Sequence, residues 1–170
     1  EIDHLTRQSY EEDGEYLALV EDILDHPVFR SMEQYIQHGT TTCREHCIQV
    51  SYLAYRICKE RGWDCRAAAR GGLLHDLFLY DWHAPVRVRG HRFHGFTHPA
   101  VAARNAEAYF SITRRERTVI LRHMWPLTPI PPSTMAGMAV VWADKVCGLR
   151  ETGATVLAII AAVFGRRPAF

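Results

Sequence analysis

The sequence predicts an all-α protein, a compact bundle of about seven helices. Two capping boxes, Thr42-x-x-Glu45 and Thr113-x-x-Glu116, mark helix starts, because each pairs a capping hydroxyl with a Glu three residues later. Convincing strand alternation is absent from the sequence. Apolar residues also recur at the spacing of one buried helix face, as at Cys47, Val50, Leu53, Ala54 and Ile57.

Proline and glycine residues divide the chain into these helices. The expected helices cover residues 12–24, 28–36, 42–61, 64–75, 97–110, 113–123 and 133–149, followed by a packed apolar helix over residues 154–164. Residues that can cap their starts are Thr42, Asp64, Thr97, Thr113 and Ser133. Pro99 is expected in a first turn, where its missing N–H costs nothing. Residues 80–97 and the Pro-rich stretch 126–132 are expected to be loops.

Length and composition indicate one domain over residues 1–170. A chain of 170 residues with 48% hydrophobic and 23% charged residues can build a core without disulfides. We expect residues 1–27 to form an N-terminal helical extension and residues 151–170 a C-terminal helix. Because the five cysteines are odd in number and include no Cys-x-x-Cys pair, we expect buried free thiols and a cytoplasmic location.

Charge and targeting patterns exclude several classes of partner. Lys+Arg total 20 against 19 Asp+Glu, and this balance makes a DNA or RNA polymer an unexpected partner. No signal peptide is recognised, and the longest apolar run, residues 154–164, is shorter than the ~20 residues that span a bilayer, so no membrane association is expected. Oligomer formation stays open, because the apolar C-terminal helix can pack against a partner as readily as against the core.

The ten histidines point to chemistry, since imidazole is the commonest metal ligand and a frequent proton carrier. A buried carboxylate without a partner is costly, so Asp76 and Asp144, both in apolar helices, need a cation, a metal or hydrogen bonds. Helices of a bundle can bring such residues together into one metal site. The ligand-type residues on or beside predicted helices are His46, His75, Asp76, His98, His123 and Asp144.

The order of these six residues resembles the binuclear branch of the HD-domain superfamily of metal-dependent phosphohydrolases, over about residues 28–150. The resemblance implies an HD-like helical fold and a first metal held by His46, His75, Asp76 and Asp144. Asp76 would bridge to a second metal, also bound by His98 and His123. The two divalent ions would be Fe or Mn, with Zn, Ni or Co as further options, and would activate water for attack on a phosphate ester.

One departure from the family pattern concerns the substrate. Many members carry a polar residue shortly after the His-Asp doublet, whereas Phe78 and Leu79 follow it here. Positive charge is therefore expected from Lys145 or from the basic loop between two ligands, and a ring is expected from the loop after His123. The expected catalytic residues are Asp76, His98, His123 and Lys145. The expected substrate contacts, suited to a nucleotide or another small phosphorylated molecule, are Arg87, Arg89, Arg92 and Trp125.

Other interpretations stay open. The same six ligands serve mixed-valence di-iron oxygenases that the family also contains. The missing polar residue after the doublet fits a non-catalytic, metal-stabilised domain that senses a ligand. His91, His94 and His98 have a spacing that can form a separate zinc site. The remaining expectations are structural: Trp142 in the core, a close helix contact at Gly71-Gly72, and surface or capping roles for His4, His26, His38 and His83.

Overall fold

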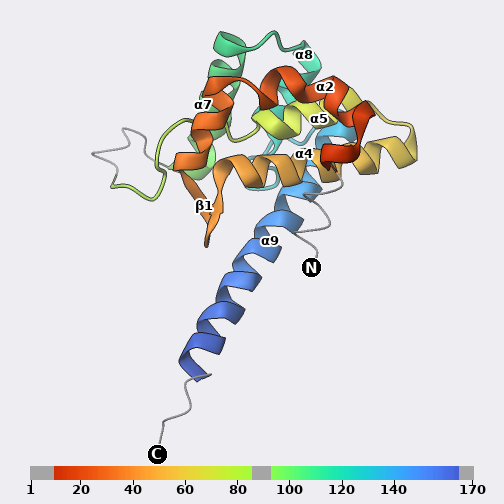
Figure 1. Ribbon diagram of the computed structural model, residues 1–170. Helices are drawn as coiled ribbons and strands as arrows, with labels where there is room; N and C mark the ends of the chain where they lie inside the picture. Colours follow the sequence, from red (N-terminus) through yellow and green to blue (C-terminus); the bar gives the residue numbers. More distant parts are fainter. Residues whose placement is uncertain (1–9, 86–92, 165–170) are drawn as a thin grey trace, which may run out of the picture.

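The computed structural model describes residues 10–85 and 93–164, with side chains as far as residue 156. Helices dominate the described chain, which confirms the all-α prediction (Figure 1). The elements are α2 (Gly14–Leu24), α3 (Pro27–Arg30), the 3-10 helix η1 (Ser31–Gln34), β1 (Ile36–His38), β2 (Thr41–Thr42), α4 (Cys43–Arg61), α5 (Cys65–Leu74), α7 (His94–Tyr109), α8 (Arg114–Arg122) and α9 (Met135–Phe164).

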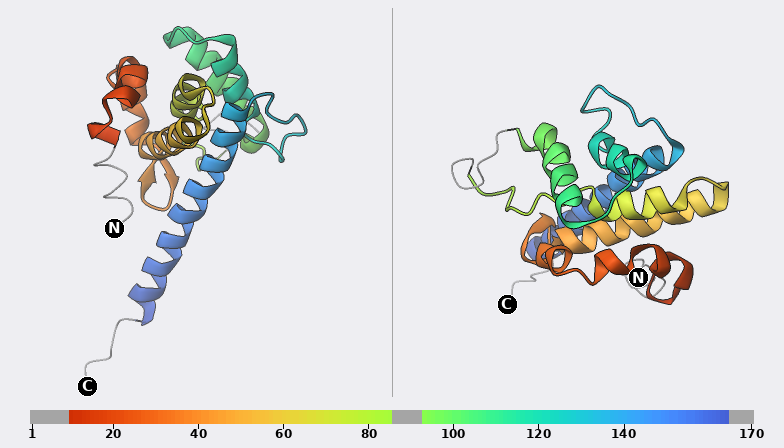
Figure 2. Two further views of the ribbon diagram at one scale, coloured as in Figure 1. Left: turned by 90° about the vertical axis from the view of Figure 1, so that its right-hand side faces the viewer. Right: turned by 90° about the horizontal axis from the view of Figure 1, so that it is seen from above.

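The antiparallel pair α4 and α5 forms the centre of the molecule. Seen from above, α2 and α3 lie on one side of this pair, and α7 and α8 lie on the other (Figure 2). Tyr16, Val20 and Ile23 of α2 are fully buried, so the segment expected as an N-terminal extension supplies part of the core. The first half of α9 packs against α4, α5 and α8.

Local sequence explains how α4 and α5 begin and why they approach closely. Thr42 and Glu45 close the predicted capping box, with N–H···O distances of 3.1 Å in both directions. Asp64 caps α5 through Ala67 N–H at 3.0 Å. A Cβ at Gly72 would lie 2.8 Å from Cα of Ser51, so the close α4–α5 contact requires glycine there. This confirms the role expected for the Gly71-Gly72 pair.

The helix predicted over residues 28–36 is helical only as far as Gln34, and its second part is a 3-10 helix. The chain forms α3 and η1 and then turns into a β1–β2 hairpin, with Gly39 at a φ of 58° in the turn. Strands of three and two residues are too short to show alternation in a sequence. A Cβ at Gly39 would collide with the Thr155 side chain of α9, so a tertiary contact also requires this glycine.

Two other helix boundaries differ from the prediction. α7 begins at His94 rather than at Thr97, so Pro99 lies inside the helix. α9 is capped by Thr134, whose Oγ1 accepts the Gly137 N–H at 3.1 Å, rather than by Ser133. It then runs unbroken from Met135 to Phe164, although a break near residue 149 was expected.

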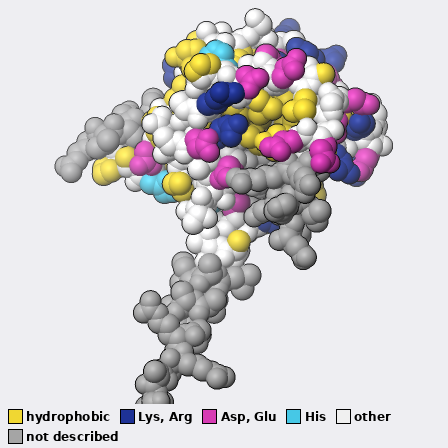
Figure 3. Space-filling view, viewed as in Figure 1, with side chains coloured by type: hydrophobic (Ala, Val, Ile, Leu, Met, Phe, Trp, Pro, Cys, Tyr) yellow, Lys and Arg dark blue, Asp and Glu magenta, His cyan; other side chains and the backbone are white. Residues whose placement is uncertain are grey.

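The second half of α9 projects away from the body as a single long helix (Figures 1 and 2). A separate helix packed on the core was expected there, and that expectation is wrong. Trp142 is also not a core residue, since 55% of its surface is exposed. No described helix is both long enough and apolar enough to cross a membrane. On the face seen in Figure 3, acidic and basic side chains are interspersed around an apolar patch.

Candidate metal centre

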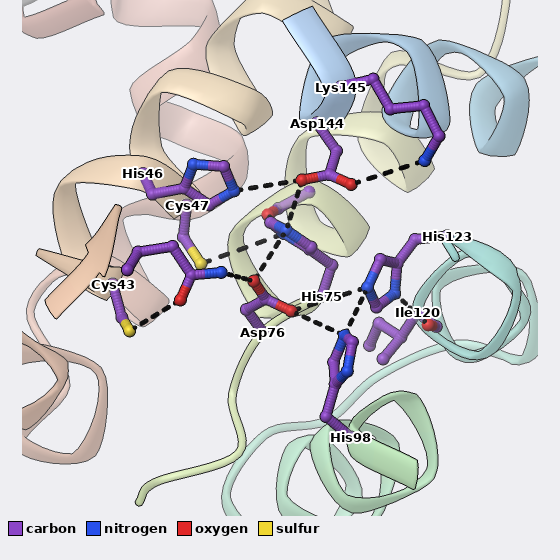
Figure 4. Close-up of polar contacts among 12 residues, drawn as sticks. Cys43, His46, Cys47, His75, Asp76, His98, Ile120, His123, Asp144 and Lys145 are labelled. Atoms are coloured by element: carbon purple, nitrogen blue, oxygen red, sulfur yellow. Dashed lines mark hydrogen bonds and ion pairs between the residues drawn. The ribbon is translucent and has the colours of Figure 1, made fainter. Parts of the chain in front are cut away.

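The six ligand-type residues predicted from the sequence converge at one end of the α4–α5 pair (Figure 4). Two groups of buried side chains have ligand atoms within 4.8 Å of one another: His46 with His75 and Asp76, and Asp76 with His98 and His123. Asp76 belongs to both groups. Asp144 joins the first group from α9, with Oδ1 3.1 Å from Nε2 of His46 and 3.6 Å from Nε2 of His75. Helices from distant parts of the chain, and the residues that end them, therefore supply one polar centre.

All four histidines are held in the same orientation. The Nδ1 atoms of His75, His98 and His123 lie 2.7–2.8 Å from the backbone carbonyls of Gly72, His94 and Ile120. The Nδ1 atom of His46 lies 3.0 Å from a Glu151 carboxylate oxygen. Since carbonyls and carboxylates only accept, each Nδ1 carries the hydrogen and donates it. Every Nε2 is left facing the centre, which is the arrangement that metal-binding histidines adopt.

The centre fits a metal because several of its buried atoms lack hydrogen-bond partners within the chain. Nε2 of His75 and Oδ1 of Asp76 are buried and have no hydrogen bond. Nε2 of His98 and Nε2 of His123 lie only 2.8 Å apart, although both Nδ1 atoms hold the ring hydrogens. Two nitrogen lone pairs at this distance repel unless a cation lies between them. Nitrogens that bind one metal at ~2.1 Å and at right angles lie ~3 Å apart, close to the spacing here.

Without a metal, the centre is strongly coupled electrostatically. Burial alone would raise the pKa of Asp76, but nearby His75 and His98 hold that pKa well below its usual range. Burial would likewise lower the pKa of His46, yet its hydrogen bonds to Asp144 and Glu151 raise that pKa to about 10. For His123, burial and the charges of His75 and His98 act together and lower the pKa to about 3. The carboxylates are therefore ionised and ready to bind cations near neutral pH.

Two buried residues of the centre were missed in the sequence. Glu151, two turns after Asp144 on α9, places both carboxylate oxygens 3.0 and 3.1 Å from Nδ1 of His46. Gln37 of β1 donates from Nε2 to Oδ2 of Asp76 at 2.6 Å and accepts from the Cys43 thiol at 3.0 Å. The seven-residue spacing of Asp144 and Glu151 places them on one helix face and was the available signal for Glu151. No local signal pointed to Gln37, because the hairpin was not predicted.

A cavity of about 560 Å³ opens onto the centre. Asp76, His98, His123 and Asp144 form its floor, and His38, Trp82, His83, His94 and Met124 are among the residues that line its walls. Trp82 stacks on His94 at 5.2 Å between ring centroids, and His94 stacks on His98 at 4.5 Å. This column of rings supports the His98 imidazole.

The residues predicted to act on or contact a substrate differ in where they lie relative to the centre. Nζ of Lys145 lies 3.9 Å from Oδ2 of Asp144, so Lys145 flanks the centre as expected from its position on the helix. Met124 lines the cavity, whereas its neighbour Trp125 is not among the described residues that line it. Arg87, Arg89 and Arg92 lie outside the described residues.

Phe78 follows the His-Asp doublet by two residues and packs beside the centre. Its ring is buried and contacts the rings of His94 and His98, at 4.8 and 5.8 Å between centroids. A polar side chain at this position would have to be buried beside these rings. Phe78 therefore packs against the α7 histidines and offers no polar contact of its own.

The remaining histidines were assigned partly correctly. His26 caps α3, since its Nδ1 accepts the Val28 N–H at 3.2 Å. His38 is half-buried and lines the cavity, so its assignment to the surface is wrong. His98 faces Asp76 and His123, while His91, the outer member of the expected zinc triplet, lies outside the described residues, as does His4. His83 is half-exposed at the cavity mouth.

Comparison with known protein families, with curated proteins and with solved structures found no match for this chain. Its function is therefore inferred from the geometry and the chemistry of the centre.

Proposed function

We propose that this protein is a metal-dependent phosphohydrolase of the HD type with a binuclear centre. The observation that carries the proposal is the position of Asp76, which is shared by two groups of buried ligands. A carboxylate shared in this way is suited to bridge two cations. His46, His75 and Asp144 would complete one metal position, and His98 and His123 the other.

The ligand chemistry favours transition metals over Mg²⁺ or Ca²⁺, since four of the six ligands are imidazoles. Fe or Mn is proposed, with Zn, Ni or Co as alternatives. Two bound ions would supply a water nucleophile near neutral pH and positive charge for the phosphoryl oxygens. Glu151 and the three backbone carbonyls hold the four Nδ1 atoms, which would leave every histidine Nε2 available to bind the ions.

The cavity supports a small substrate. Its volume of about 560 Å³ accommodates a molecule of nucleotide size, and its floor is the proposed metal centre. Lys145 stands beside Asp144 and adds a positive charge for an anionic group. Trp82 offers little free ring face for a base, because it is stacked against His94 and lies 3.9 Å from the His83 ring between centroids. A nucleotide would therefore be held mainly through its phosphate.

A mixed-valence di-iron oxygenase is the second candidate, and one observation favours it. The described residues that line the cavity include no Lys or Arg, so a phosphate would depend on the metals and on Lys145 at the edge. The same first ligands would serve either chemistry. Substrate-dependent O₂ uptake separates the oxygenase from the hydrolase.

The proposal is tested by comparing the native protein with Asp76→Ala after reconstitution with Mn²⁺ or Fe²⁺. We expect about two metals per chain and hydrolysis of at least one phosphate ester from a nucleotide and sugar-phosphate panel. Asp76→Ala should lose both metals and the activity, whereas the exposed-loop variant Asp81→Ala should keep them.

Three results would count against the hydrolase. Two bound metals without turnover on the panel would favour the metal-stabilised sensing domain, and O₂ uptake would favour the oxygenase. Native protein that binds no metal under any reconstitution would exclude all three metal-dependent functions.

A further inference from the structure

The β1–β2 hairpin carries a bulge at the edge of the metal centre. The pairs across it are Ile36 with Thr42 and His38 with Thr41, which leaves Gln37 as an extra residue of β1. In a regular strand, neighbouring side chains point to opposite faces. A bulge interrupts this alternation and redirects side chains, and bulges are frequent beside active sites. Here Gln37 and His38 both line the cavity that opens onto the centre.

Gln37 anchors the hairpin to the centre. Its Oε1 accepts the Cys43 thiol at 3.0 Å, which fixes the orientation of the amide, and its Nε2 donates to Oδ2 of Asp76 at 2.6 Å. At the turn, Gly39 packs against the Thr155 side chain of α9, and the hairpin lies beside that helix (Figure 1). The bulge is therefore fixed at both ends, and so is the direction of the residue that follows Gln37.

The imidazole of His38 is held in place by three contacts. Its ring meets the His46 ring edge-on, at 5.7 Å between centroids, and lies 6.2 Å from the Trp82 ring. On α9 it lies against Gly148, where a Cβ would be 3.5 Å from Nε2 of His38. Gly148 follows Asp144 by four residues, on the same face of the helix. His38 therefore stands beside the proposed metal position of His46 and Asp144.

The hydrogen-bonding capacity of His38 is not used within the described chain. Its contacts there are with rings and with Gly148, and none of the described residues hydrogen-bonds to its ring nitrogens. Removing an imidazole partly from water without a hydrogen bond is costly. The described residues that line the cavity also include no Lys or Arg, so an anionic group meets few donors on the cavity wall.

The imidazole carries an N–H in either protonation state, so it can donate to an oxygen of a bound anion. On the basis of the proposed phosphohydrolase function, we propose that His38 donates a hydrogen bond to a phosphoryl oxygen of the substrate at the metal position of His46. Phe78, after the His-Asp doublet, offers no polar contact, whereas the bulged hairpin supplies one.

Inorganic phosphate is a suitable probe of this contact. It is the product of phosphate monoester hydrolysis and keeps the phosphoryl oxygens of the substrate, so it can be used whatever the rest of the substrate is. Its affinity is measured by titration calorimetry on the full chain, reconstituted with Mn²⁺ and freed of unbound metal. His38→Ala should bind phosphate roughly tenfold more weakly or worse, because a hydrogen bond to a charged acceptor is lost, and should keep the metal content of the native protein.

Conservative variants separate hydrogen bonding from packing. His38→Asn places an amide N–H near the position of Nδ1, and His38→Gln places one near that of Nε2. One of the two should restore most of the phosphate affinity, which identifies the donating nitrogen. Thr40→Ala, in the exposed turn of the same hairpin, is the matched control and should bind phosphate as the native protein does. For any ester that is hydrolysed, His38→Ala should raise KM more than it lowers kcat.

Four results would overturn the assignment: native phosphate affinity in His38→Ala, a loss of affinity that neither amide variant restores, a loss of metal in His38→Ala, or metal-loaded native protein that binds no phosphate. The first three leave the hydrolase standing if the native protein turns over an ester. Phosphate binding that depends on His38, without turnover of any ester, would instead support the contact and count against the hydrolase.

Discussion

Two buried polar clusters lie side by side on the same helix pair. In one cluster the polar atoms find hydrogen-bond partners within the chain, and in the other several do not. The first is the metal centre around His46 of α4 and His75 at the end of α5. The second, one to two turns further along α4, joins Tyr16 of α2 to Ser51, next to Gly72 of α5. Both clusters consist mostly of buried side chains, but only the first contains orphaned atoms.

In the tyrosine cluster, each hydroxyl finds a partner inside the chain. Ser51 donates to the Ala69 carbonyl at 2.6 Å, so the Tyr16 hydroxyl must donate to Ser51 Oγ, at 2.8 Å. Burial raises the pKa of Tyr16 well above its usual value, which keeps it a neutral donor. In the metal centre, by contrast, lone pairs of histidine nitrogens and carboxylate oxygens converge, and the chain supplies too few hydrogens to form hydrogen bonds with all of them. Burial alone therefore does not identify a site, whereas unmatched acceptors aimed at one point do.

The largest expected effect is that of removing metal, which should change only the first cluster. Metals that bind the folded chain alone stabilise it by ~4 kcal/mol at a thousand times their dissociation constant, which raises the melting temperature by roughly 8–16 °C. Calorimetry of the metal-loaded protein with and without chelator measures this shift. Asp76→Ala should be insensitive to chelator. An equal response in that variant would show that the metal binds elsewhere.

Glu151→Gln should weaken the metal centre without disturbing the tyrosine cluster. The amide keeps an acceptor for Nδ1 of His46 but removes the negative charge, and partners of this kind contribute roughly tenfold or more to metal affinity. Titration calorimetry with Mn²⁺ measures the loss, and the exposed neighbour Arg150→Gln serves as the control. Native affinity in Glu151→Gln would mean that Glu151 only fills space.

Tyr16→Phe should weaken the tyrosine cluster without disturbing the metal centre. It removes the donor to Ser51 and is expected to lower the free energy of unfolding by about 1 kcal/mol, while metal content stays the same. Urea unfolding of the metal-free protein measures this. Tyr109→Phe changes a half-exposed ring and should be neutral. A loss of metal in Tyr16→Phe would show that the two clusters are coupled.

The smallest effect concerns an ion pair outside both clusters. The buried Arg70 guanidinium lies 2.6 Å from Asp22, and despite the opposing effect of partial burial it holds the pKa of Asp22 below its usual range. A lowered pKa stabilises the fold above the unfolded value of ~3.9, and this contribution is lost as the pH falls through the folded value. Asp22→Asn should therefore cost about 1 kcal/mol or less at pH 7.

The pH dependence of the unfolding free energy tests whether Asp22 stabilises the fold through its charge. The difference in unfolding free energy between native protein and Asp22→Asn should shrink toward zero as the pH falls below the unfolded pKa of ~3.9 and through the lower folded value. A difference that does not change with pH would mean that Asp22 acts through packing and not through its charge.

Local sequence was sufficient to predict a helix start wherever the capping residue and its partner lie within a few residues of each other. The capping boxes at Thr42 and Thr113 and the cap at Asp64 form as predicted, because their partners are three residues away. The helix start at His94 was missed because it lacks such a local capping pattern. Its N-cap residue, Phe93, has a left-handed φ of 51° and no capping hydrogen bond from its side chain, so no sequence pattern marks the helix start.

By itself, the sequence determined the helical class and which six residues can act as ligands, because residue type and helical spacing are properties of the chain alone. Tertiary structure decided the rest. His46 acquires its direction from Glu151, 105 positions away, and Asp76 its hydrogen bond from Gln37 of an unpredicted hairpin. Tertiary structure also decided that the Trp142 side chain is exposed. Such contacts join residues distant in the chain, so they exist only once the helices have packed.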